Sequence, residues 1–186
     1  MFAWIEQRRR MRGLPEAIAK VAKKIPDREA FEAGAREVAE RFGAGAIGVL
    51  RKRFHQDKPR PEEFEFPNAR LGAWLHRWQF AIFEVFYCLR EPALEAVRKA
   101  AFGRYDWTQG NAIEVLCRWA AEGMDRERTL GDLKNKMPKM RSEALEVAAA
   151  RLLPRAERDS AIREIVEELR GVAEFEEACG EEESGE

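Results

Sequence analysis

The sequence has few of the residues that usually carry metal or nucleophilic chemistry. Among its 186 residues are two histidines, His55 and His76, and three cysteines without Cys-x-x-Cys spacing. A multi-histidine metal centre needs more ligands than two histidines supply, and a zinc site or a disulfide framework needs paired cysteines. A serine or cysteine nucleophile would also have almost no histidine to act as its base. We therefore predict no metal, no cofactor and no catalytic residue.

Long hydrophobic runs are also missing. Apolar residues make up 45% of the chain and charged residues 36%, and no window approaches the roughly 18 uninterrupted apolar residues typical of a membrane-spanning helix. At the beginning of the sequence, Met1–Ile5 place apolar side chains before a basic run, whereas a secretory signal has the reverse order. We expect a cytoplasmic protein without a transmembrane segment.

Apolar residues recur at helical spacing along almost the whole chain, and no segment alternates as a strand would. The stripe formed by Ile162, Ile165, Val166 and Leu169 is one example. The pattern predicts an all-α protein with helices over about residues 15–25, 28–42, 45–54, 71–89, 92–102, 108–122, 125–136, 139–152 and 157–172. Three prolines within residues 55–69 predict a long loop, and Pro154 is predicted to separate two helices.

An internal repeat runs through these predicted helices. The motif Ala-Ile-Glu-Val at Ala112–Val115 matches Ala-Leu-Glu-Val at Ala144–Val147 with an offset of 32 residues, and Ala-Ile pairs recur earlier at residues 81, 46 and 17. Successive helix pairs of this kind bury their apolar stripes on one another. On this motif and spacing, residues 14–172 resemble the HEAT/armadillo superfamily of α-helical repeats, with units close to the short HEAT-like repeats.

The resemblance implies a right-handed α-α superhelix, or solenoid, of about five helix-pair repeats, one of them interrupted by the proline-rich loop at residues 55–69. It implies a single α-helical repeat domain over residues 1–173. Because the open end of a solenoid needs cover, residues 1–13 are predicted to form an N-terminal capping helix. Residues 174–186 carry seven glutamates and no basic residue, so we expect an acidic, disordered tail.

Basic residues gather in the N-terminal third of the sequence. Residues 1–60 carry 15 basic and 8 acidic side chains, and residues 1–173 have a net charge of +6 although the whole chain is at −1. Basic side chains can contact phosphates, but they also fill the solvent faces of ordinary amphipathic helices. The candidate anion or nucleic-acid contacts are Arg8, Arg9, Arg10, Arg12, Arg51, Lys52 and Arg53.

Trp107 is the candidate exposed aromatic contact. It lies in a turn between two predicted helices, where its ring could meet a ligand. The alternative is that Trp107 packs as a hydrophobic staple beside an ordinary helix N-cap, formed by Asp106 or Thr108. The sequence favours the staple, because both N-cap residues are in place.

These features favour a non-enzymatic helical-repeat module that binds a protein or peptide partner. The alternative is a nucleic-acid-binding HEAT-like protein that uses the basic N-terminal third. Such a protein would resemble the HEAT-like alkylpurine DNA glycosylases, and Asp106 would then be the acidic group nearest to Trp107. A peripheral membrane contact through Phe2, Trp4 and Ile5 is less favoured than the capping helix.

Overall fold

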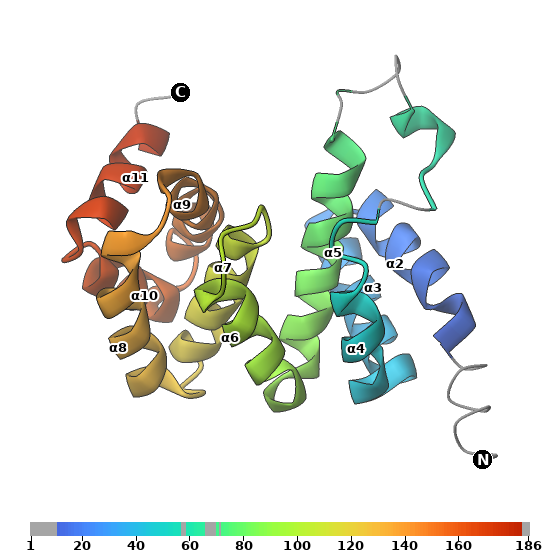
Figure 1. Ribbon diagram of the computed structural model, residues 1–186, viewed down its shortest axis with the longest axis horizontal. Helices are drawn as coiled ribbons and strands as arrows, with labels where there is room; N and C mark the ends of the chain where they lie inside the picture. Colours follow the sequence, from blue (N-terminus) through green and yellow to red (C-terminus); the bar gives the residue numbers. More distant parts are fainter. Residues whose placement is uncertain (1–10, 57–58, 66–69, 71, 184–186) are drawn as a thin grey trace. The chain divides into compact units, whose positions relative to one another are not determined.

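The computed structural model describes residues 11–56, 59–65, 70 and 72–183, and every regular element in these ranges is helical (Figure 1). The all-α prediction is therefore confirmed. No helix among the described residues is long and apolar enough to cross a membrane. The chain divides into two compact units, residues 1–96 and 97–186. The single repeat domain predicted over residues 1–173 stays a prediction.

In the first unit, α2 and α3 form a hairpin whose connection follows the expected capping chemistry. The side chain of Asp27 accepts a hydrogen bond from Ala30 N at 3.0 Å and so begins α3, while Gly43, at φ 59°, ends it. The elements of this unit are η1 (Met11–Gly13), α2 (Leu14–Lys23), α3 (Arg28–Phe42), η2 (Gly43–Gly45), α4 (Ala46–Arg51), η3 (Glu62–Phe64), α5 (Ala73–Leu89) and η4 (Glu91–Ala93).

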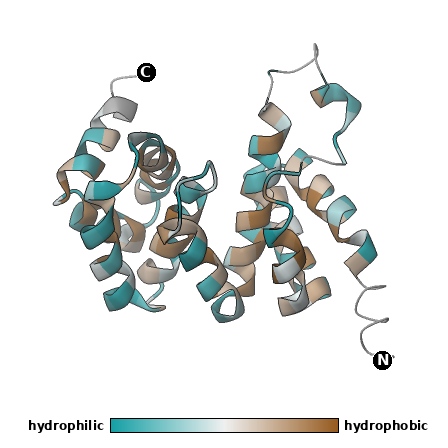
Figure 2. Ribbon diagram, viewed as in Figure 1, coloured by the Kyte–Doolittle hydropathy of each residue, from teal (hydrophilic) through white to brown (hydrophobic). Residues whose placement is uncertain are grey.

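The apolar helix α5 is the core element of the first unit. Both α2 and α3 pack on it, and Figure 2 shows how hydrophobic residues dominate its length. Its polar side chains hold the chain that leaves α4. Trp78 Nε1 donates to the Arg53 carbonyl at 2.9 Å, and Gln79 Nε2 donates to the Phe54 carbonyl at 3.0 Å. The proline-rich loop predicted from residue 55 therefore starts from a fixed point.

In the second unit, α7 lies among the helices that follow it. It contacts α8, α9 and α10, and α11 packs on α9. The elements of this unit are the end of α6 (Leu94–Phe102), α7 (Gln109–Ala121), α8 (Arg126–Lys136), η5 (Met137–Lys139), α9 (Ser142–Ala156), α10 (Ser160–Leu169) and α11 (Ala173–Glu183).

Pro154 does not separate two helices, so that prediction is wrong. It lies inside α9, which continues to Ala156. Proline fixes φ near the helical value, so α9 can continue through Pro154 with the loss of the one hydrogen bond that the missing N–H would have donated. A side chain of α10 binds the end of α9, because Arg163 Nε donates a hydrogen bond to the Ala156 carbonyl at 3.0 Å.

Every residue of α7 from Gln109 to Ala120 is buried, and these residues include a carboxylate. Glu114 Oε1 lies 2.9 Å from Arg155 Nε of α9 and 3.2 Å from Arg118 Nη1 of its own helix. A buried carboxylate is costly unless cations pair with it. The ion pairs with two guanidinium groups therefore allow α7 to be covered on all sides.

The first turn of α7 approaches α9 closely at Gly110. A Cβ atom at this position would lie 2.6 Å from the Ala144 carbonyl oxygen and 2.6 Å from Val147 Cβ. Real Cβ atoms do not approach backbone oxygen so closely, and neither partner is the end of a flexible side chain. Glycine is therefore required where α7 crosses α9.

We predict that Gly110→Ala lowers the free energy of unfolding by about 1–3 kcal/mol, because the two helices must separate to accept the methyl group. Gly131→Ala in α8 is the matched control. Its Cβ would meet nothing within 4 Å, so the higher helix propensity of alanine should stabilise the protein by about 0.5–1 kcal/mol. Urea unfolding followed by circular dichroism measures both changes. A loss of stability in both variants, or in neither, would contradict the close approach.

The disordered tail predicted from residue 174 is wrong over α11. Phe175, Ala178 and Cys179 are buried and follow the spacing of one helix face, and this face packs on α9. The glutamates that dominate the composition of this segment concealed a three-residue apolar stripe. Spacing outweighs composition here, because three apolar side chains on one face are enough to dock a short helix on a packed neighbour.

Phe175→Ala tests whether α11 is part of the folded unit. Phe175 has no exposed surface, so the cavity left by truncation should lower the free energy of unfolding by about 3–5 kcal/mol. Glu177→Ala, at an exposed position of the same helix, should change it by no more than about 0.5 kcal/mol. Denaturant unfolding distinguishes the two outcomes, since a disordered segment would make both substitutions neutral.

Candidate anion-binding pocket

A pocket of about 320 Å³ opens within the second unit. Its walls come from the end of α6, the loop that follows it, the first turn of α7, the end of α8 and the segment that leads into α9. The volume lies at the lower end of the range for sites that bind small molecules or peptide side chains. Its lining residues are Phe102, Gly103, Tyr105, Gln109, Asn135, Lys136, Lys139, Met140 and Arg141.

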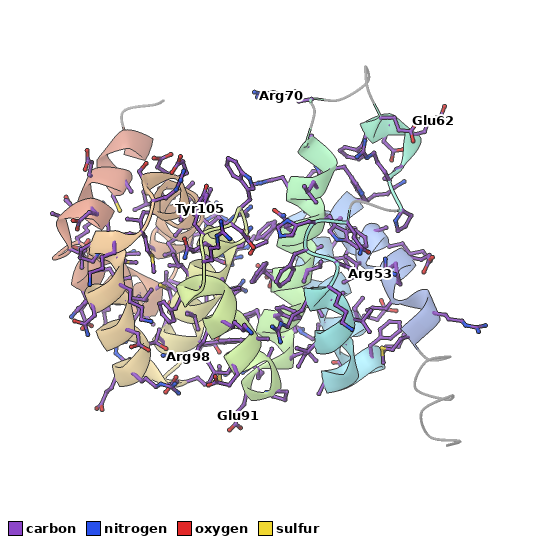
Figure 3. The ribbon with its side chains drawn as sticks, in the orientation of Figure 1. Arg53, Glu62, Arg70, Glu91, Arg98 and Tyr105 are labelled. Carbon is purple, nitrogen blue, oxygen red and sulfur yellow. The ribbon has the colours of Figure 1, made fainter. Side chains whose placement is uncertain are left out.

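Arg98 holds two of these walls in position. It lies on α6, is buried, and donates from Nη1 to Asp125 Oδ2 at 3.1 Å and from Nη2 to Asp132 Oδ2. Asp132 belongs to α8, and Asp125 is the residue directly before it. Because a buried guanidinium with two carboxylate partners is hard to displace, α6 and α8 are fixed relative to each other. Figure 3 labels Arg98 and Tyr105, which come from α6 and from the loop after it.

The lining of the pocket is positively charged. Lys136, Lys139 and Arg141 contribute three cations, and no carboxylate is found among the described lining residues. Two of the cations stand over aromatic rings. Lys136 Nζ is 4.9 Å from the centre of the Phe102 ring, and Arg141 Cζ is 4.9 Å from the centre of the Tyr105 ring. These contacts keep the cations at the edge of the pocket.

The Tyr105 hydroxyl is held in its protonated form. Burial raises the pKa of Tyr105 above its ordinary value, and the carboxylate of Glu143 raises it further, while the Arg141 guanidinium lowers it. The net pKa lies above the ordinary value of 10.0. At neutral pH, far below even the ordinary value, the hydroxyl carries its proton and can both donate and accept a hydrogen bond.

Gln109 lies at the inner side of the pocket and is 4% exposed. Its Nε2 donates to the Ala101 carbonyl at 2.8 Å, which fixes the orientation of the side-chain amide. Its Oε1 is buried and has no hydrogen-bond partner among the described residues. A buried acceptor without a donor is unfavourable, so burial of this oxygen is a cost that the packing of the second unit has to offset.

The basic residues singled out in the sequence do not line this pocket. Arg12, Arg51 and Lys52 are exposed in the first unit, and Arg53, which is half-buried there, accepts the Trp78 hydrogen bond through its carbonyl. The three arginines predicted before Arg12 lie outside the described residues. A role of these basic residues in binding stays a prediction, while the cations that line this pocket come from the second unit.

Trp107 is 69% exposed, so it is not packed as a staple. Its ring centre lies 6.1 Å from that of Tyr105, which lines the pocket. The turn is closed by Asp106 instead, whose Oδ1 accepts hydrogen bonds from both the backbone N–H and the hydroxyl of Thr108. The staple that the sequence favoured is therefore wrong, and Trp107 is an exposed side chain beside Tyr105 of the pocket. Its role as a contact for a ligand stays a prediction.

The cations of the pocket were missed in the sequence, although a signal exists. From Leu133 to Ser142 the chain holds Lys134, Lys136, Lys139 and Arg141 without any acidic residue. A run of basic residues at the end of a helix and in the segment after it indicates a site that can bind an anion. It was overlooked because residues 121–186 as a whole are acidic.

Among the described residues, no group of three or more His, Cys, Asp or Glu side chains that could hold a metal ion is found. Cys117 is fully buried, and both this burial and the neighbouring Glu114 raise the pKa of its thiol, so Cys117 is not an activated nucleophile. The Asp106 carboxylate is engaged in its own turn.

Comparison with protein-family models, with curated proteins and with solved structures finds no match for this chain. Membership of the HEAT/armadillo superfamily therefore stays a prediction that rests on the repeat in the sequence. The chemistry of the pocket has to be inferred from its own residues.

We predict that Arg141→Gln raises the pKa of Tyr105 further and that Glu143→Gln lowers it, because the first change removes a cation that favours the phenolate and the second removes an anion that opposes it. The ¹³Cζ resonance of Tyr105, observed in a Tyr87→Phe background, reports the titration. A pKa that moves in the same direction in both variants would contradict this arrangement of charges.

Proposed function

We propose that the chain is a non-enzymatic helical-repeat binding module, and that the pocket of the second unit receives an acidic segment of a protein or peptide partner. The observation that carries the proposal is the one-sided charge of the pocket, where Lys136, Lys139 and Arg141 converge without a carboxylate among the described lining residues. Complementary charge of this kind attracts an acidic partner and fixes its register.

The aromatic side chains suit a peptide partner as well. Phe102 and Tyr105 supply flat apolar surface beside the cations, and Trp107 stands exposed next to them. Tyrosine, tryptophan and arginine are the residues that most often dominate the free energy of protein interfaces. A short segment that combines carboxylates with an apolar side chain would meet both kinds of surface.

The packing of the second unit supports the repeat part of the proposal. The helix with the Ala-Ile-Glu-Val motif, α7, contacts the helix with the Ala-Leu-Glu-Val motif, α9. Gly110 on α7 meets Ala144 and Val147 on α9, so both helices begin near the crossing point. Stacking of corresponding helices is the contact expected of neighbouring repeats in a right-handed superhelix. A cytoplasmic location belongs to the same proposal.

Binding of nucleic acid is the second candidate function, and Trp107 is the observation that favours it. A tryptophan that is 69% exposed and lies next to Tyr105 of the basic pocket can stack on an unpaired base while the cations of the pocket contact phosphates. Such binding would show a steep dependence on salt concentration.

Charge reversal in the pocket tests the proposal. We expect the double variant Lys139→Glu/Arg141→Glu to weaken binding of a fluorescein-labelled hexaglutamate peptide by about ten- to thirtyfold at low ionic strength, because two attractive contacts become repulsive. Fluorescence anisotropy measures the change.

The matched control is Arg51→Glu/Lys52→Glu, which alters the net charge equally but at exposed positions of the first unit. It should leave binding of the peptide almost unchanged. Equal losses in both double variants would reject the pocket as the site. If a single-stranded oligothymidylate binds more tightly than the peptide and loses affinity in the control variant, the nucleic-acid alternative replaces the proposal.

A further inference from the structure

A loop of the first unit shows how this chain holds one of its own acidic segments. The turn η3 has the sequence Glu-Glu-Phe and is followed by a further glutamate. Phe64 packs on the Trp74 ring of α5, with 5.0 Å between the ring centres, and the Arg77 guanidinium lies 5.0 Å from the centre of the Phe64 ring. Glu63 Oε1 pairs with Lys23 Nζ of α2 at 2.9 Å. A tryptophan, an arginine and a lysine thus bind a glutamate together with the phenylalanine next to it.

The second unit has the same three kinds of side chain at its pocket. The Trp107 ring lies 6.1 Å from that of Tyr105, the Arg141 guanidinium lies 4.9 Å from the centre of the Tyr105 ring, and Lys139 lines the same pocket. The two tryptophans differ in exposure, because Trp74 is buried whereas Trp107 is the large apolar side chain that is exposed among the described residues. The ring of Trp107 is therefore accessible to an aromatic side chain from a ligand.

The turn that carries Trp107 is fixed before any ligand binds. Asp106 Oδ1 accepts hydrogen bonds from the backbone N–H and the hydroxyl of Thr108, and both Thr108 and Gln109 are buried. The exposed indole is thus attached to an anchored backbone, which reduces the entropy that is lost when another ring packs on it. Tryptophan side chains of this kind often dominate the free energy of protein interfaces.

We infer that the acidic peptide bound by the pocket contains an aromatic residue next to a glutamate or an aspartate, and that Trp107 packs on this aromatic ring while the neighbouring carboxylate pairs with Lys139 or Arg141. This inference rests on the proposed function and adds to it the side chain that accompanies the negative charge. Trp107 is thus a specificity-determining residue, because it distinguishes an acidic peptide with an aromatic residue from a peptide that is only acidic.

Two peptides of equal charge test the inference in the unaltered protein. The probes are acetylated and amidated Glu-Glu-Glu-Phe-Glu-Glu and the same peptide with alanine in place of phenylalanine. Neither carries a dye, because an aromatic dye could itself pack on Trp107. We expect the phenylalanine peptide to bind the full-length protein about five- to tenfold more tightly at low ionic strength, as a new aromatic pair implies. Isothermal titration calorimetry measures both affinities.

A resonance of Trp107 itself shows where the phenylalanine binds. The indole ¹H–¹⁵N resonance of this residue is identified by its absence from the spectrum of Trp107→Phe. At saturation it should move much further with the phenylalanine peptide than with the alanine peptide, because the current of an aromatic ring shifts the resonances of the atoms packed against it.

The variant Trp107→Ala separates this tryptophan from the other apolar surface of the pocket. The preference for the phenylalanine peptide should fall to no more than about twofold in this variant. Trp107→Phe is the matched control, which keeps an aromatic ring at the same position and should retain a preference of at least about threefold. Since Trp107 is exposed, both variants should fold, and thermal unfolding verifies this. If Trp107→Ala does not fold, the indole titration of the unaltered protein decides.

The outcomes distinguish the inference from the proposed function. If neither peptide binds at low ionic strength, the proposed function fails and the inference fails with it. If both peptides bind with equal affinity, or if the preference for phenylalanine persists in Trp107→Ala, only the inference is overturned. Movement of the indole resonance with an oligothymidylate, and with neither peptide, would overturn both.

Discussion

The second unit depends on the pairing of one buried carboxylate. Glu114 lies on α7, a helix covered on all sides, and it is held between Arg118 of the same helix and Arg155 of α9. Without these partners an ionised side chain could not be taken out of water at this position. Helix α7 begins at Gln109, and α9 begins just after Arg141. The ion pairs that join the two helices therefore also help to position these two lining residues of the pocket.

Three carboxylates of the second unit are engaged in structural ion pairs. Asp125 and Asp132 bind Arg98 and join α8 to α6, while Glu114 is enclosed within α7 and α9. The basic residues that face the pocket are therefore balanced by aromatic rings at its edge and not by acidic side chains in its lining. The same interactions that stabilise the helices leave the positive charge of the pocket available to a partner.

The fold class could be predicted from the sequence, because each helix buries one stripe of apolar residues and the spacing of these residues is visible in the sequence of that helix alone. Spacing also contained the stripe of α11, which composition concealed. The pocket could not be predicted, because Tyr105 and Arg141 meet only through the packing of α7 on α9. Periodicity shows that a helix has a buried face, but it does not show which helix covers that face. Charge clustering pointed to Arg51 and Lys52, which stand out along the chain but do not line the pocket of the second unit.

The composition of the pocket wall determines how acidity acts on this site. The wall contains neither a histidine nor a carboxylate, and these are the side chains that titrate between about pH 4 and 8. In the proposed function, acidification over that interval therefore leaves the charges of the lining side chains unchanged and protonates the carboxylates of the acidic peptide. Release of that peptide at low pH would consequently depend on how many glutamates and aspartates it carries.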